Sequence, residues 1–192
     1  MKFIEKEMKK WKSLEEITKE LVKKSIKWKR KGMTYTNNYG HSFNVYDLLV
    51  KDWYDEDICI AWLLHDIIED WWHTEQQLLD LWYNARVVSL VVACSHNPSI
   101  EDSYKRRENM MKKIKESKNE DALIIKIADF TDNLQTAHLL KEDKSQTFVL
   151  KKGPYLMDLK NNILWDNKYF NQSNINNLFY DRWIDAKLLS TQ

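Results

Sequence analysis

The scarcity of glycine and proline limits what this chain can fold into. Only 3 glycines and 2 prolines occur among its 192 residues. A sheet of several strands uses these residues at its tight turns, whereas long helices joined by short polar loops need few of them. The sequence therefore favours an all-α fold.

Apolar residues recur at helical spacing along most of the chain. Over residues 3–26 they stand in a background of Lys and Glu, which predicts one or two amphipathic helices. Similar patterns predict helices over 42–52, 56–69, 74–95, 103–117, 119–140, 155–165 and 174–189, with loops over 32–40, 97–102 and 151–154. We expect one domain over residues 1–192, an all-α helical bundle whose C-terminal helices, within 155–190, close it.

Composition and charge are those of a globular protein. Hydrophobic residues make up 43% of the chain, charged residues 31%, and the net charge is +1, which argues against an electrostatic nucleic-acid binder. Cys59 and Cys94 lie in apolar stretches without metal-type spacing, which indicates buried thiols in a reducing compartment. The longest apolar run, 87–94, is too short for a membrane span, and the amino terminus lacks the apolar core of a signal peptide. We therefore expect a cytoplasmic protein.

The segment LLHDIIED carries the strongest chemical signal. On a helix, Glu69 lies one turn beyond His65 and Asp70 one turn beyond Asp66, so one face presents an imidazole and three carboxylates. The neighbouring residues are apolar and indicate a buried helix, in which such charges are costly without partners. A divalent cation resolves the conflict, because imidazole and carboxylate are suitable ligands for Mn²⁺, Fe²⁺ or Zn²⁺.

Two further segments complete a set. His41 follows a loop and opens an apolar-patterned helix. Asp129 follows a mostly apolar run in DALIIKIADFTDN, and Asn133 lies one turn beyond it on the same face. Taken singly, a capping histidine and a salt-bridge aspartate are the simpler interpretations, but the ordered pattern favours a metal site.

This pattern resembles the HD superfamily of metal-dependent phosphohydrolases. Within it, the pattern resembles the hydrolase domain of the Rel/SpoT alarmone enzymes and their small stand-alone relatives, over a motif core of about 25–140. The resemblance implies an HD-type helical bundle and a divalent metal, most often Mn²⁺, with Zn²⁺, Fe²⁺ and Co²⁺ as alternatives. It implies the metal ligands His41, His65, Asp66 and Asp129, and it implies that Glu69 and Asp70 position or deprotonate the attacking water.

The same resemblance suggests substrate contacts. KWKRKGMTYTNNYGH is similar to the basic stretch that precedes the first metal histidine of the family, which places Arg30 and Lys31 near the nucleotide. SYKRRENMMKKI is similar to the Lys/Arg-rich helix of alarmone hydrolases, where Lys105, Arg106 or Arg107 would meet a phosphate. Asn133 would contact the sugar or base, or donate a hydrogen bond to Asp129. For the basic residues, a solvated charged face is the simpler alternative.

Several positions depart from the family pattern. Thr34, Tyr35 and Thr36 replace its usual Pro-Tyr-Ile, Ser42 follows the first histidine in place of proline, and Gln135 stands where arginine is common. These changes fall on the substrate-facing side, so the substrate is less defined than the metal chemistry. Three histidines match no motif position and are expected not to be ligands: His73, His96 and His138. The nine tryptophans, among them Trp62, are expected to serve packing.

Three functions remain open on this evidence. The first is an alarmone hydrolase that removes the 3′-pyrophosphate of (p)ppGpp. The second keeps the chemistry with another small-molecule substrate, a (deoxy)nucleotide, or with the 3′ end of modified tRNA as the partner of a toxin. The third is a non-catalytic nucleotide-binding or partner-binding module, although no ligand or acidic pair of the motif is missing. Fold alone does not decide among them.

Overall fold

The computed structural model describes residues 13–25, 39–68, 73–135 and 148–189 of the chain. The described residues form helices and contain no strand, which confirms the expected all-α class. The first half holds α2 (Leu14–Ser25), α3 (Gly40–Lys51), α4 (Glu56–Leu64), α6 (Glu75–Asp80) and α7 (Ala85–Cys94). The second half holds α8 (Ser103–Ser117), α9 (Glu120–Leu134), a short π-helical turn (Phe148–Lys152), α11 (Gly153–Ile163), α12 (Lys168–Asn171) and α13 (Asn174–Leu189).

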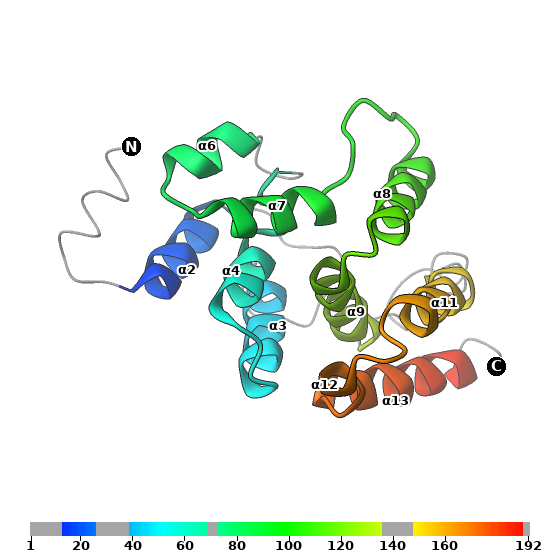
Figure 1. Ribbon diagram of the computed structural model, residues 1–192. Coiled ribbons are helices and arrows are strands. Elements are labelled where there is room, and N and C mark those ends of the chain that lie inside the picture. Colours follow the sequence, from blue (N-terminus) through cyan, green and yellow to red (C-terminus); the bar gives the residue numbers. More distant parts are fainter. Residues whose placement is uncertain (1–12, 26–38, 69–72, 136–147, 190–192) are drawn as a thin grey trace.

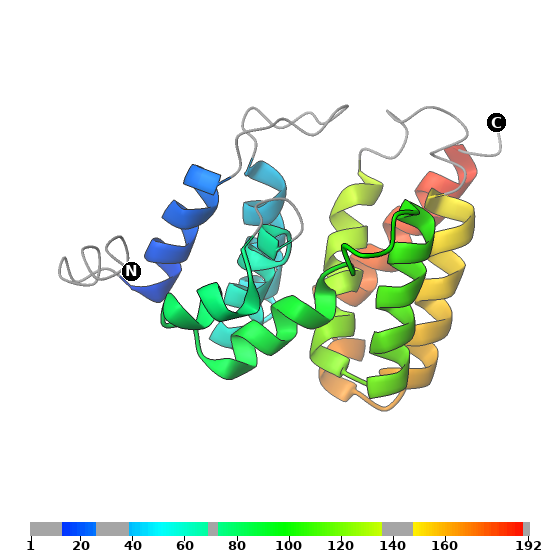
Figure 2. The ribbon, with the colours of Figure 1, turned by 90° about the horizontal axis from the view of Figure 1, so that it is seen from above.

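Helices α4 and α9 form the centre of the molecule. Every residue of α4 from Ile58 to Leu64 is buried, and so is the stretch of α9 from Ala122 to Asp132. Helices that are apolar on most sides must be covered all round. Accordingly α2, α3 and α7 pack on α4, while α3, α7, α11 and α13 pack on α9 (Figures 1 and 2).

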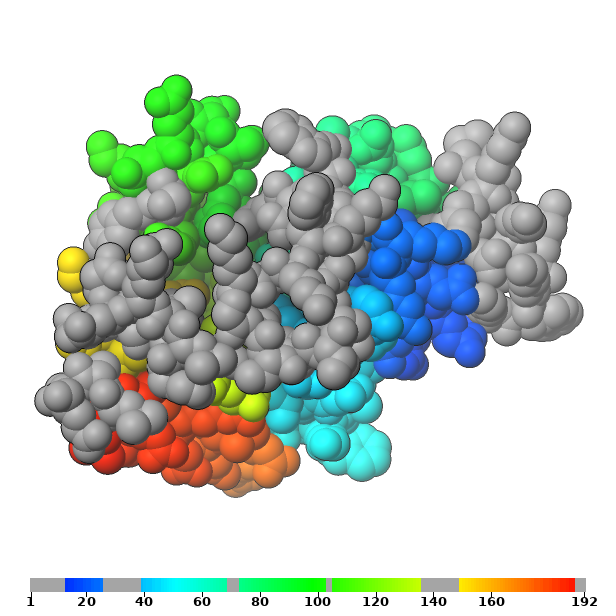
Figure 3. All heavy atoms as spheres, turned by 180° about the vertical axis from the view of Figure 1, so that it is seen from behind, coloured from blue at the N-terminus to red at the C-terminus, as the bar shows by residue number. Residues whose placement is uncertain are grey.

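The two halves of the chain meet where α3 and α7 pack on α9 and where α13 packs on α3. Helix α13 packs on both α9 and α3, and in Figure 3 the C-terminal helices lie beside α3 at the surface. Asp52, just after α3, reinforces this junction because its carboxylate accepts hydrogen bonds from the backbone N–H groups of Asn174 (3.0 Å) and Ile175 (2.7 Å). The C-terminal helix α13 thus packs on α9 and α3.

The predicted helix over 74–95 is wrong in one respect, since it is two helices. Helix α6 ends in a turn with Trp82 at φ 68°, and Asn84 then caps α7 by accepting a hydrogen bond from the N–H of Val87. The apolar spacing continues through this corner because Leu78 and Tyr83 are both buried. Periodicity alone therefore does not reveal the break.

Two other predicted boundaries also differ from the structure. Helix α4 ends at Leu64, so the helix predicted over 56–69 does not continue through His65 and Asp66, which form a turn. The predicted loop over 151–154 is helical, because Pro154 lies in the first turn of α11, where proline is tolerated.

Other expectations agree with the described chain. Residues 97–102 lie outside the helices, and Cys59 and Cys94 are buried free thiols. Among the described helices, none combines the length and apolar character that crossing a bilayer requires.

Candidate metal centre

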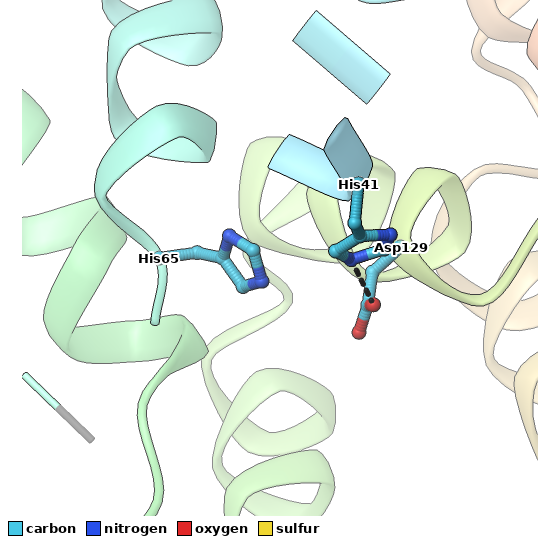
Figure 4. Close-up of side chains that lie close together, drawn as sticks. All are labelled: His41, His65 and Asp129. Atoms are coloured by element: carbon cyan, nitrogen blue, oxygen red, sulfur yellow. Dashed lines mark ion pairs between the residues drawn. The ribbon is translucent and has the colours of Figure 1, made fainter. Parts of the chain in front are cut away.

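Three helices bring His41, His65 and Asp129 together. His41 is the second residue of α3, His65 follows the last residue of α4, and Asp129 lies in the buried part of α9. One ligand atom of each residue lies within 4.8 Å of the others, and the three residues are only 2%, 2% and 6% exposed (Figure 4). Three of the four predicted metal ligands therefore converge in one buried place.

The two imidazoles are oriented by hydrogen bonds at Nδ1. His65 Nδ1 lies 2.7 Å from the backbone oxygen of Trp62, and because a carbonyl only accepts, Nδ1 carries the proton. His41 Nδ1 lies 2.7 Å from Oδ2 of Asp132, which fixes the same tautomer when that carboxylate is ionised. In the neutral rings, Nε2 then holds the lone pair that a metal requires. Partners of this kind are typical of metal-binding histidines.

Trp62 holds both rings in place. Its ring is fully buried, stacks on His65 at a centroid distance of 3.9 Å and lies T-shaped to His41 at a centroid distance of 5.4 Å. Its indole N–H donates to the backbone oxygen of Ser42 at 2.7 Å, which ties α4 to the first turn of α3. The expected packing role of Trp62 is therefore also a role in shaping the site.

Asp129 is held as an ionised carboxylate. Burial by itself raises the pKa of this group, but the Lys126 ammonium and the charge of Lys152 outweigh it and hold the pKa well below its usual range. Oδ2 lies 3.1 Å from Nζ of Lys126, and Oδ1 lies 3.3 Å from Nε2 of His41. Asn133 donates to Oδ1 at 2.5 Å and to the backbone oxygen of Asp129 at 2.9 Å.

The donor set fits a divalent transition metal. Two neutral imidazole nitrogens and one carboxylate oxygen are suitable ligands for Mn²⁺, Fe²⁺ or Zn²⁺. Asp66, the fourth predicted ligand, is a neighbour of these three residues, but its carboxylate is not among the converging ligand atoms. Its Oδ1 is 2.9 Å from Nε2 of His65, the nitrogen that would bind the ion. Its role as a ligand stays a prediction.

The remaining predicted residues are distributed as follows. Glu69, Asp70, Arg30 and Lys31 lie outside the described residues. Lys105, exposed, and Arg106, half-buried, stand in the first turns of α8. His73 and His96 are not in the group of ligand atoms, and His138 lies outside the described residues.

Two residues that contact the group directly were not predicted from the sequence. Lys126 lies one turn before Asp129 on α9, and Asp132 lies one turn after it. The spacing of the three residues was a readable signal of a shared face. Gln135, where the family commonly has arginine, also belongs here, because its side-chain amide donates to Oδ1 of Asp132 at 2.8 Å.

Comparisons with known proteins agree with this geometry. The family model described as HD domain matches residues 19–152. A search of curated protein sequences found no significant match. A similar solved structure is described as a metazoan orthologue of SpoT that hydrolyses ppGpp and plays a role in starvation responses. It is 19% identical, with a TM-score of 0.72, and the match covers 92% of this chain and 98% of that chain. This likeness shows a shared fold, and because the family model spans most of the sequence, the chain belongs to the HD domain family of metal-dependent phosphohydrolases.

Proposed function

We propose that this HD-domain phosphohydrolase removes the 3′-pyrophosphate from ppGpp or a close relative, with Mn²⁺ as the metal. The observation that carries the proposal is the buried group of His41, His65 and Asp129, whose imidazoles are oriented to present Nε2. The likeness in fold to a protein described as hydrolysing ppGpp supports this choice of substrate.

We assign one set of residues to metal binding and another to proton transfer. His41, His65 and Asp129 would hold the ion, with Asp66 as a fourth ligand. When bound, a divalent ion acidifies water and neutralises charge on a phosphoryl oxygen. A carboxylate that is not a ligand is needed to take the proton, and we assign this to Glu69 and Asp70.

The reaction adds one water to the phosphorus that is bonded to the ribose 3′-oxygen. The bond between this phosphorus and the 3′-oxygen breaks, the 3′-oxygen gains a proton, and pyrophosphate leaves. From ppGpp the other product is GDP. We assign phosphate contacts to the basic residues predicted near the substrate, Arg30, Lys31, Lys105 and Arg106, and a sugar or base contact to Asn133.

The test measures phosphate and pyrophosphate release from ppGpp, pppGpp, dNTPs and dNMPs, with Mn²⁺ or with EDTA. Wild type is compared with Asp129→Ala and with the matched control Asp158→Ala, which removes an aspartate whose side chain is 56% exposed. We expect Mn²⁺-dependent release of pyrophosphate from ppGpp by wild type and the control only. Activity confined to deoxynucleotides would assign a nucleotidase. No release of phosphate or pyrophosphate from any of these substrates would overturn the proposal and favour a tRNA substrate or a binding module.

A further inference from the structure

A buried lysine lies against the candidate metal centre. Lys126 is only 5% exposed, and its neighbours Ile125 and Ile127 are fully buried. Lysine is rarely buried without a partner, because removing an ammonium from water is costly. Its Nζ lies 3.1 Å from Oδ2 of Asp129, so the cost is offset by a carboxylate that is itself assigned to the metal.

The two oxygens of Asp129 face different groups. Oδ1 accepts a hydrogen bond from Asn133 and faces Nε2 of His41, whereas Oδ2 faces Lys126. A protonated lysine has no lone pair and is not a metal ligand. A divalent ion beside Oδ1 and the ammonium beside Oδ2 would therefore be two cations sharing one carboxylate.

The ammonium of Lys126 beside Asp129 has opposite effects in the metal-free and the metal-bound protein. Without metal, the ammonium compensates the buried charge of Asp129 and lets the three helices stay together. With metal, the ammonium repels the ion across a few ångströms of poorly screened protein. Lys126 would thus stabilise the metal-free protein and weaken metal binding by the same contact.

We propose that Lys126 is a positioning residue that acts as the counter-charge of Asp129 when no metal is bound. The protein can therefore fold before it binds the metal. This inference rests on the metal site of the proposed function but not on its substrate. Asn133 donates hydrogen bonds to both the side chain and the backbone of Asp129, so we expect the carboxylate to keep its position when the ammonium is removed.

The experiment compares Lys126→Gln, Lys126→Met and Lys126→Arg with wild type. Gln keeps a donor without charge, Met keeps the length without either, and Arg keeps the charge. Lys112→Met is the matched control, because Lys112 lies on α8 with its side chain 67% exposed. Thermal unfolding is measured in EDTA and in Mn²⁺, and Mn²⁺ affinity is measured by calorimetry.

We expect the Gln and Met variants to unfold at a lower temperature than wild type in EDTA. Adding Mn²⁺ should raise their unfolding temperature by more than it raises that of wild type. Their Mn²⁺ affinity should rise by about tenfold, whereas Lys126→Arg and Lys112→Met stay within a few-fold of wild type. A Met variant that folds only with Mn²⁺ also supports the proposal, and if it folds in neither condition the Gln variant decides.

Two outcomes would overturn the inference. One is a folded Gln variant whose Mn²⁺ affinity is unchanged or weaker, and the other is a Gln or Met variant as stable in EDTA as wild type. If wild type itself binds no Mn²⁺, the proposed function fails together with the claim of competition. The EDTA measurement then still decides whether Lys126 compensates Asp129.

Discussion

Asp132 and His41 are joined across helices α9 and α3 by a contact of 2.7 Å between Oδ2 and Nδ1. Both side chains are almost completely buried. Gln135 donates to the other oxygen of Asp132 at 2.8 Å, so a chain of three side chains ends on the imidazole of His41. These hydrogen bonds determine that His41 presents Nε2 to His65 and Asp129.

Replacing Asp132 tests that relationship. We expect Asp132→Ala to weaken Mn²⁺ binding by about 10- to 100-fold, because His41 loses the acceptor that fixes its tautomer and orientation. Calorimetric titration with Mn²⁺ measures the effect, and circular dichroism verifies the fold. Asp158→Ala, which removes an exposed aspartate on α11, should bind like wild type. Equal affinities for all three proteins would show that His41 needs no such support.

Trp62→Phe should destabilise the protein and loosen the site. The change removes the buried hydrogen bond from the indole N–H to the backbone oxygen of Ser42 and part of the surface stacked on His65, which together cost about 1–3 kcal/mol of unfolding free energy. Urea unfolding measures the loss. Trp165→Phe is the control, because Trp165 is 78% exposed and should change little. A Trp62 variant as stable as this control would contradict the assigned role.

Gly153→Ala should lower the free energy of unfolding by about 1–3 kcal/mol, because the added methyl group overpacks the start of α11. A Cβ at this position would lie 2.8 and 2.9 Å from Cδ1 and Cε2 of Trp183, and closer still to Nε1. The indole cannot move away without losing its hydrogen bond to the backbone oxygen of Val149. Chemical unfolding measures the loss.

The control for Gly153→Ala is a double-mutant cycle with Trp183→Leu. In that background the ring is absent, so the cost of the methyl group should largely disappear. The same cost in both backgrounds would rule out the contact with Trp183 as its cause.

Trp53 occupies a backbone conformation that suits glycine. It follows the end of α3 with φ 59°, and its side chain is 85% exposed, so little burial compensates the strain. We expect Trp53→Gly to be more stable than Trp53→Ala by about 1 kcal/mol in chemical unfolding, because only glycine relieves the left-handed conformation. The reverse order would show that α3 ends differently in solution.

The sequence by itself determined the class of fold and most of the residues at the site. The scarcity of glycine and proline and the helical spacing of apolar residues predicted an all-α protein, and helices 103–117 and 174–189 were predicted with their observed bounds. The ordered residues His41, His65-Asp66 and Asp129 predicted the family. These features are local, because spacing along one helix fixes which residues share a face.

Only the tertiary structure decided how those faces meet. The pairing of His41 with Asp132, the contact of Trp62 with His41 and the hydrogen bond between Asn84 and Asp57 each join segments that are far apart in the chain, so no periodicity encodes them. The end of α4 at Leu64 and the corner at Trp82 were likewise hidden, because buried residues continue through both. Lys126 is the clearest case. Spacing along α9 places Lys126 beside Asp129, but the burial of both side chains is decided by the helices that pack on α9.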